Sequence, residues 1–321
     1  MKSLVFCFTL LSTIAISIAA SLPAQAQRAR VFVSVTGNDA NPCTAGSPCK
    51  TFQAAHDAVL AGGEISVLDT GGYGTLIINK AVSIVAVGVQ ASIAIPSGGT
   101  GVTINAGSTD KVSLRGLTLD GQGVSADGID FNSGGSLTMD DCVVRNMGGE
   151  GLHFISTAAS DEDLDISNSS FFDNGANGIV ITTESTGNIH ASIDRTLLHG
   201  NTHYGMYLVG NNGGDGILNV TVTDSVASNN STNPNMSGGF RIDGGAFFSN
   251  LFLTRTVAQG NLDGVVATGG NGVLWLAQST VSQNKRFGFS VGGVAVIKSY
   301  SDNYMANNGN NIGALTGVTK Q

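Results

Sequence analysis

The stretches Gly-Ile-Asp-Phe at 128–131 and Gly-Leu-His-Phe at 151–154 share one pattern: a glycine followed by an apolar, a variable and an apolar residue. The pattern begins again, at intervals of 23 to 34 residues, at Gly178, Gly205, Gly239, Gly264 and Gly288. Self-similarity at such a period is typical of a solenoid, in which each repeat forms one coil.

Apolar residues also recur at fixed offsets from these glycines. The residues one place after the glycine are Ile129, Leu152, Ile179, Met206, Phe240, Val265 and Phe289. The short apolar runs alternate with period two, which indicates strands, and none is long enough for a helix. Strands of about three residues, divided by Gly, Asn and Ser turns, predict parallel strands stacked coil on coil.

Asparagines support the same register. Asn174, Asn201 and Asn284 each lie four residues before a repeat glycine, and Asn146 and Asn261 lie one residue away from that offset. Asparagine tolerates the left-handed turn conformation, and stacked asparagine side chains hydrogen-bond along a solenoid. We therefore expect an asparagine ladder at one corner of the coils.

The repeats, together with the N-terminal stretch from Val31 to Gly88, resemble the right-handed parallel β-helix proteins of the pectate-lyase-like superfamily, in particular exported bacterial members. The resemblance implies an all-β fold, a right-handed parallel β-helix with a short N-terminal capping helix. This superfamily includes lyases, hydrolases, epimerases and non-catalytic adhesins, so the resemblance alone assigns no reaction.

Residues 1–26 are predicted to be a signal peptide. Lys2 precedes an apolar run from Leu4 to Ala20, and a small-residue cleavage site follows at Ala24-Gln25-Ala26. We therefore expect export to the periplasm or the extracellular space. No later segment is apolar enough to cross a bilayer.

Residues 27–63 are predicted to form an N-terminal cap made of a strand, a disulfide loop and an amphipathic helix. Phe52, Ala55, His56 and Val59 recur at helical spacing, with Gly62-Gly63 as the expected end of the helix. We expect His56 to be a packed cap residue. Residues 64–321 would then form the β-helix, with about a dozen coils.

The cysteines fit an oxidising compartment. Cys43 and Cys49 enclose a short Pro/Gly loop, which indicates a disulfide. Cys142 has the same repeat offset as Ser169, Thr196 and Ser279, so we expect it to be buried and unreactive.

The composition argues against nucleic acid as a partner. The chain carries 15 Lys and Arg against 23 Asp and Glu, a formal net charge of −8. Binding to a phosphate backbone needs clustered basic residues, which this sequence lacks.

Residues two places after each glycine should point outward and form one stripe across adjacent coils. They are Asp130, His153, Val180, Tyr207, Arg241, Val266 and Ser290. The positions that flank this stripe add Asp127, Glu150, Tyr204 and Asp243. Acids, an imidazole, phenols and a guanidinium on one face are typical of a surface that binds a linear sugar polymer, and the Asn229–Ser237 insertion is a candidate wall for it.

Three functions stay open at this point. Asp127, Asp130 and Glu150 are candidates for hydrolysis of a glycosidic bond. A polyuronate lyase would instead use His153 or Tyr207 as a base and Arg241 as a cation. With Tyr204, Tyr207, Arg241 and Asp243 as substrate-binding candidates, we expect a protein that binds or processes extracellular polysaccharide. A non-catalytic structural or adhesin-like role is the alternative, in which the same residues are a solvated outer strand.

We predict no metal and no cofactor. Calcium near Asp161 and Asp163 is a weaker alternative, because the acidic run lacks the spacing of known calcium repeats and suits a solvated turn. The sequence leaves the oligomeric state open.

Overall fold

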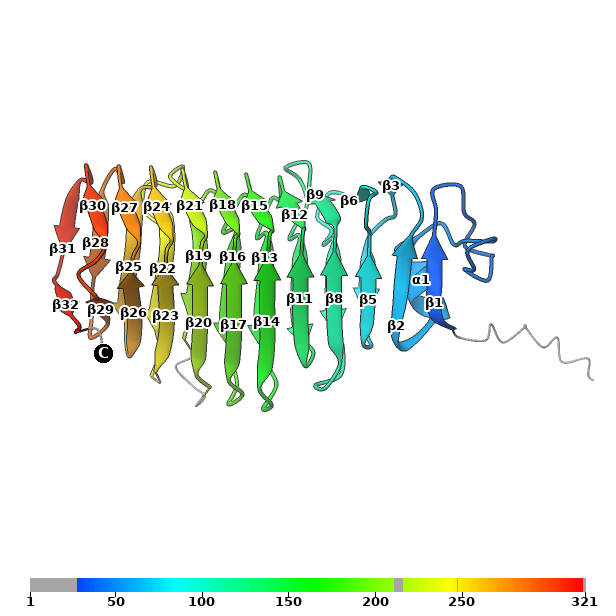
Figure 1. The fold of residues 1–321 in the computed structure, drawn as a ribbon, viewed down its shortest axis with the longest axis horizontal. Coiled ribbons are helices and arrows are strands. Elements are labelled where there is room, and N and C mark those ends of the chain that lie inside the picture. Colours follow the sequence, from blue (N-terminus) through cyan, green and yellow to red (C-terminus); the bar gives the residue numbers. More distant parts are fainter. Residues whose placement is uncertain (1–27, 211–215, 247, 320–321) are drawn as a thin grey trace, which may run out of the picture.

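The repeats form a solenoid in a computed structural model that describes residues 28–210, 216–246 and 248–319. The predicted signal peptide lies outside the described residues. The chain winds into a right-handed parallel β-solenoid of about ten turns, with its strands side by side along the long axis (Figure 1). The predicted fold class is confirmed.

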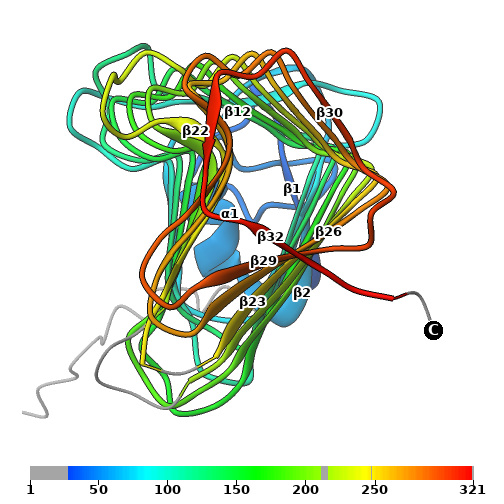
Figure 2. The same ribbon diagram turned by 90° about the vertical axis from the view of Figure 1, so that its left-hand side faces the viewer.

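Three parallel sheets form the walls of the solenoid (Figure 2). Sheet I has 12 strands: β1 (Arg28–Val33), β2 (Val59–Val67), β5 (Val82–Val85), β8 (Lys111–Arg115), β11 (Ser136–Asp140), β14 (Glu162–Ser167), β17 (Ile189–Asp194), β20 (Leu218–Thr223), β23 (Ser249–Thr254), β26 (Gly272–Ala277), β29 (Val296–Ser299) and β32 (Leu315–Gly317).

Sheet II and sheet III have 10 strands each. Sheet II contains β4 (Leu76–Ile78), β7 (Val102–Asn105), β10 (Ile129–Ser133), β13 (Leu152–Ser156), β16 (Ile179–Thr183), β19 (Tyr204–Val209), β22 (Gly238–Gly244), β25 (Asp263–Gly269), β28 (Phe287–Val291) and β31 (Asn310–Ile312). Sheet III contains β3 (Gly71–Gly72), β6 (Ala91–Ala94), β9 (Leu117–Asp120), β12 (Val143–Arg145), β15 (Ser170–Phe172), β18 (Leu197–His199), β21 (Val226–Ser228), β24 (Val257–Gln259), β27 (Thr280–Ser282) and β30 (Tyr304–Ala306).

The register of sheet II stacks the predicted core residues in one column. Ile129 pairs with Leu152, Leu152 with Ile179 and Ile179 with Met206, and all four are fully buried. Burying such a side chain contributes about 1.5–3 kcal/mol. The predicted parallel stacking is confirmed.

The repeat glycines are required by the close approach of neighbouring coils. A Cβ atom at Gly178 would lie 2.7 Å from the carbonyl oxygen of Gly205 on the next coil. Any side chain at this position would therefore push two coils apart, which explains why one glycine recurs through the chain.

The predicted asparagine ladder exists, but it lacks Asn146 and gains Asn230 and Asn308. Its side chains hydrogen-bond from coil to coil and are Asn174, Asn201, Asn230, Asn261, Asn284 and Asn308. Asn146 is not a member, because it takes a left-handed conformation (φ 54°) and donates to Asp120 instead. Asn230 was missed because the loop inserted after it shifts its offset from Gly239.

The N-terminal cap differs in detail from its prediction. Helix α1 (Phe52–Ala58) begins after Thr51, whose side chain accepts the backbone N–H of Ala54. It does not run to Gly62-Gly63, because the chain enters β2 at Val59 and pairs there with β1. His56 is buried, as expected of a packed residue.

The cysteines behave as predicted. Cys43 and Cys49 form a disulfide. Cys142 is buried and takes part in no disulfide. Burial raises the pKa of the Cys142 thiol to about 11, so this thiol is a poor nucleophile. Among the helices of the described residues, none is both long and apolar enough to span a membrane.

Candidate functional site

The predicted outward stripe lies on sheet II. Pairing of β10, β13, β16, β19 and β22 places Asp130, His153, Val180, Tyr207 and Arg241 on consecutive strands. The four polar side chains are partly exposed, whereas Val180 is buried. The stripe is thus less exposed than expected, and Val180 divides it into two clusters.

Tyr204 is the clearest departure from the sequence interpretation. It is 1% exposed, because its ring packs against the backbone of Gly238 on the next coil. Its hydroxyl accepts a hydrogen bond from Arg241 at 2.8 Å. A direct contact between Tyr204 and a ligand therefore needs the surrounding side chains to move.

The residues that directly precede the repeat glycines form a second ladder. Asp127 Oδ1 accepts the backbone N–H of Glu150 at 2.5 Å, and Glu150 Oε2 accepts that of Asn177 at 2.6 Å. Asn177 Oδ1 in turn accepts the N–H of Tyr204 at 2.9 Å. Asn177 was missed by the sequence interpretation, although its place before Gly178 gives it the same register as Asp127 and Glu150.

Asp127, Asp130, Glu150 and His153 form what we call the carboxylate cluster. Ligand atoms of Asp127, Asp130 and His153 all lie within 4.8 Å of one another. Asp130 Oδ2 accepts the Thr100 hydroxyl at 3.1 Å, but its Oδ1 is buried and has no hydrogen-bond partner among the described residues. The cluster is therefore incompletely satisfied.

Burial and like charges raise the pKa values of two carboxyl groups in this cluster. The pKa of Glu150 is raised to about 7, mainly by burial and further by the charges of Asp127 and Asp130, against the lowering effect of the Asn177 hydrogen bonds. The pKa of Asp130 is also raised, first by burial and then by Asp127. A carboxyl group that titrates near neutrality is suited to general acid catalysis.

Three residues of the cluster form a candidate cation site. Asp127, Asp130 and His153 each offer one ligand atom, and two carboxylates with an imidazole are a donor set that divalent transition metals accept. The acidic run at Asp161 is arranged differently: Asp161 accepts from Asn188, and Glu162 points into the core.

The second cluster, which we call the tyrosine–arginine network, consists of Tyr204, Tyr207, Arg241, Asp243 and Thr268. Arg241 binds both oxygens of Asp243 at 2.8–2.9 Å. Asp243 also accepts the hydroxyls of Tyr207, at 2.5 Å, and of Thr268. The guanidinium of Arg241 lies 5.3 Å from the ring centres of Tyr204 and Tyr207. Every charge in this network has a partner.

Pairing fixes the protonation states of the network. Burial alone would raise the pKa of Asp243, but the hydrogen bonds from Arg241, Thr268 and Tyr207 lower it below its usual value. Burial and Asp243 raise the pKa of Tyr207 above its ordinary value. At neutral pH Tyr207 is therefore a protonated phenol and Asp243 a carboxylate.

The Asn229–Ser237 insertion lies at the network end of the stripe. Its Asn233 donates a backbone hydrogen bond to Thr202, close to Tyr204 in the chain. Arg286 holds the insertion through the carbonyl oxygens of Pro234 and Asn235, and pairs with the buried Asp263 at 2.7 Å. The insertion is thus anchored beside the stripe.

Comparisons with known proteins support the fold. The sequence model described as "Right handed beta helix region" matches residues 100–311. No curated protein sequence matches the chain.

Solved structures similar to this one have low sequence identity. The pectate lyase Pel9A is 17% identical, with a TM-score of 0.61, and the match covers 91% of this chain and 78% of that one. The GH136 lacto-N-biosidase from Eubacterium ramulus is 10% identical, with a TM-score of 0.54 and coverages of 91% and 68%. ORF18 of Geobacillus virus E2 is 15% identical, with a TM-score of 0.53 and coverages of 82% and 57%. The match over residues 100–311, on a solenoid with the same architecture, shows that this chain belongs to the right-handed β-helix family.

Proposed function

We propose that this protein is exported and hydrolyses a neutral polysaccharide at the carboxylate cluster. The observation that carries the proposal is the arrangement of Glu150, whose pKa is raised to about 7, beside Asp127 and Asp130. Two kinds of carboxyl group in one site, one kept protonated and one able to ionise, are what glycoside hydrolysis requires.

In this mechanism Glu150 is the general acid. Its carboxyl would donate a proton to the leaving sugar oxygen, while the Asp127–Asp130 pair would activate a water or stabilise positive charge at the anomeric carbon. Asp127 is already held in place, because its Oδ1 accepts the Glu150 N–H. Tyr207 and Arg241, three and four strands from Asp130, would contact sugar units on one side of the cleaved bond.

The charge of the site favours a neutral substrate over a polyuronate. The cluster holds no cation-forming Lys or Arg to attract an anionic chain, its ionised carboxylates repel one, and the positive charge of Arg241 is neutralised by Asp243. A lyase that uses Tyr207 as its base is disfavoured too, because the pKa of this phenol is raised above its ordinary value.

Two further observations support export and a saccharide substrate. The Cys43–Cys49 disulfide is stable in an oxidising compartment, which agrees with the predicted signal peptide. Two of the similar structures are named as a pectate lyase and a lacto-N-biosidase, both enzymes that act on saccharides.

A non-catalytic role is the second candidate, and one observation favours it. Asp127 and Glu150 already accept backbone N–H groups from the next coil, so their presence has a structural explanation without catalysis. In that case the stripe would only bind sugars.

The test is hydrolysis of a panel of polymers by the purified chain without residues 1–26. The panel contains neutral mannan, galactan and β-glucan as well as pectate and alginate. New reducing ends without unsaturated products on a neutral polymer are the expected result. Glu150→Gln should lower the rate at least about 100-fold, the usual contribution of general acid catalysis.

Asp165→Asn is the matched control, because Asp165 is an exposed carboxylate on the outer face of sheet I. Its rate should equal that of the wild type. A chelator should leave the rate unchanged, and a loss would indicate a cation held by Asp127, Asp130 and His153. Unsaturated products, or no product from any polymer, would refute the proposed hydrolysis.

A further inference from the structure

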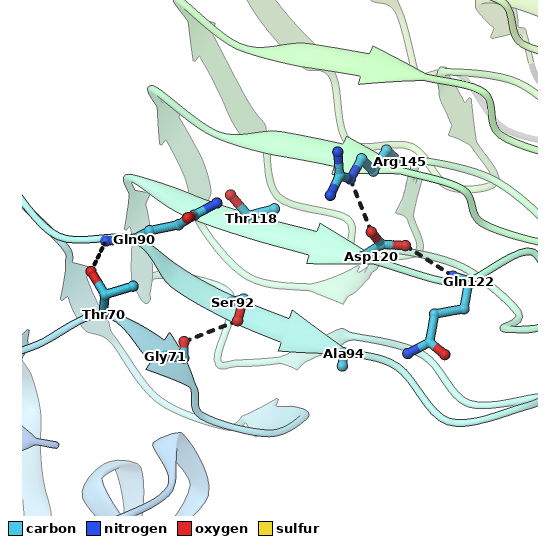
Figure 3. Close-up of a pocket in the computed structure, with 9 residues that line it drawn as sticks. All are labelled: Thr70, Gly71, Gln90, Ser92, Ala94, Thr118, Asp120, Gln122 and Arg145. Atoms are coloured by element: carbon cyan, nitrogen blue, oxygen red, sulfur yellow. Dashed lines mark hydrogen bonds and ion pairs between the residues drawn. The ribbon is translucent and has the colours of Figure 1, made fainter. Parts of the chain in front are cut away.

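A concave surface lies on sheet III, away from the stripe. A cavity of about 440 Å³ opens over β6, β9 and β12, and Figure 3 shows its lining side chains along these strands. A neighbouring cavity of about 450 Å³ shares Thr70, Gln90 and Thr118 in its lining. The two cavities therefore adjoin each other, and together we call them the sheet III groove.

Several polar groups in the groove are free to bind a ligand. Arg145 uses only its Nε atom to bind Asp120, at 2.9 Å. Within the described part of the chain, its terminal nitrogens have no hydrogen-bond partner. The same is true of the side-chain amides of Gln90 and Gln122 and of the Thr118 hydroxyl.

Other groups in the groove are held rigid. The Ser92 hydroxyl donates to the carbonyl of Gly71 at 3.0 Å, and the Thr70 hydroxyl accepts the Gln90 N–H at 3.1 Å. Thr118 lies between Ser92 and Val143 in the register of the sheet, so its backbone is fixed by two ladders. A ligand would therefore meet a pre-formed surface, which lowers the entropic cost of binding.

The lining favours a neutral ligand rich in hydroxyl groups. Each arginine of the groove is balanced by an acid: Arg145 pairs with Asp120, and Arg115 with Asp140. Asp141 adds a further negative charge to the lining, so an anionic chain gains no net attraction here. Planar amide and guanidinium groups bind paired hydroxyls, and small apolar side chains such as Ala94 and Val143 suit the C–H face of a sugar ring.

We propose that the sheet III groove is a second saccharide-binding site, which holds a neutral glycan chain apart from the carboxylate cluster. The groove lies on a different sheet from the stripe, so one polymer strand could be held at the groove while another part of it reaches the cluster. Binding at two sites raises the effective concentration of the polymer at the cluster. The binding itself does not rest on the proposed hydrolysis, since it needs no residue of the stripe.

The test measures binding and hydrolysis separately. Affinity electrophoresis and calorimetry with mannohexaose, galactohexaose and cellohexaose measure binding, with hexagalacturonate as the acidic probe. Thr118→Trp fills the centre of the groove, and the milder Gln90→Ala/Gln122→Ala removes two uncommitted amides without loss of any native hydrogen bond from their side chains. Ser192→Trp, at an exposed outward position of sheet I, is the matched control.

We expect at least one neutral hexasaccharide to bind, and each groove variant to weaken this binding by about tenfold or more, the effect of losing one or two hydrogen bonds. The Ser192→Trp control should bind like the wild type. Hydrolysis of a disaccharide reporter, if present, should be the same in all four proteins. This distinguishes failure of the groove from failure of the cluster.

Three results would overturn the proposal: no binding of any neutral hexasaccharide by the wild type, unchanged binding in the folded groove variants, or binding of hexagalacturonate alone. Circular dichroism and thermal unfolding establish whether each variant is folded. If Thr118→Trp does not fold, the folded Gln90→Ala/Gln122→Ala variant decides the test.

Discussion

The carboxylate cluster and the tyrosine–arginine network occupy the same stripe of sheet II, about 14 Å apart from Asp130 to Tyr207 at three strand spacings. In the network every charge has a partner, since Arg241 binds both oxygens of Asp243. In the cluster three carboxyl groups lie close together, and one oxygen of Asp130 has no partner within the described chain. The same repeat position thus supports either a stabilising network or an electrostatically strained site.

The contrast distinguishes polar groups that stabilise the fold from polar groups that are available for chemistry. Unpaired, partly buried acids cost stability, and proteins retain such groups where they serve chemistry. Four changes test the contrast, and they follow in order of the expected effect.

Asp243→Asn should destabilise the protein by about 3 kcal/mol, because it leaves the partly buried Arg241 without its counter-ion. Urea unfolding measures the change. Asp224→Asn is the matched control, since Asp224 pairs with Arg255 in the same two-point geometry but on an exposed surface, where the loss should be too small to measure. Equal losses in both variants would mean that the network contributes no more than a surface ion pair.

Glu162→Gln extends the comparison to a carboxyl group that is shielded from solvent. Glu162 is fully buried, and neither of its oxygens makes a well-formed hydrogen bond within the described chain. Burial raises its pKa from the usual 4.5 to about 7, against a smaller lowering effect of the Ser156 hydroxyl. The folded state therefore keeps the proton while the unfolded chain loses it. The associated stability is fully present below pH 4.5 and is lost as the pH rises to about 7.

The Glu162→Gln variant should consequently match the wild type at pH 4 and exceed it by on the order of 2 kcal/mol at pH 8. Unfolding curves at the two pH values measure the difference. If the difference in stability between the variant and the wild type is the same at pH 4 and pH 8, Glu162 is ionised or solvated in the folded protein.

The pH profile of hydrolysis should report Glu150. The general acid must be protonated, so kcat/KM should fall about tenfold per pH unit above pH 7. Tyr207→Phe should change KM and leave this inflection in place, since the network holds no group that titrates near neutrality. A flat profile between pH 6 and 9 would exclude Glu150 as the acid.

Asp130→Asn should have the smallest effect and the opposite sign to Asp243→Asn. It removes a charge that burial and Asp127 disfavour, so we expect a gain of about 1 kcal/mol in the free energy of unfolding at pH 7. The amide oxygen can still accept the Thr100 hydrogen bond. Destabilisation comparable to that of Asp243→Asn would remove the distinction between the two clusters.

Much of the architecture could be predicted because a solenoid converts sequence period directly into position. Once Gly128 and Gly151 are recognised as one register, Ile129 must stack on Leu152 and Asp130 must lie beside His153. The disulfide and the burial of Cys142 followed from local spacing in the same way. The predictions failed where an insertion or an irregular coil changed the register, as at Asn230 and at the end of α1.

The sequence by itself determined which side chains share a column, because side chains alternate along a strand and coils stack at a fixed spacing. Only the tertiary structure decided how each polar group is satisfied. It buried Tyr204 against Gly238, paired Arg241 with Asp243, and left Asp130 and Glu150 among like charges. It also formed the sheet III groove from residues of four coils. Hydrogen bonding and burial depend on the three-dimensional surroundings of a side chain. The sequence register shows which residues share a column, but it does not show these surroundings.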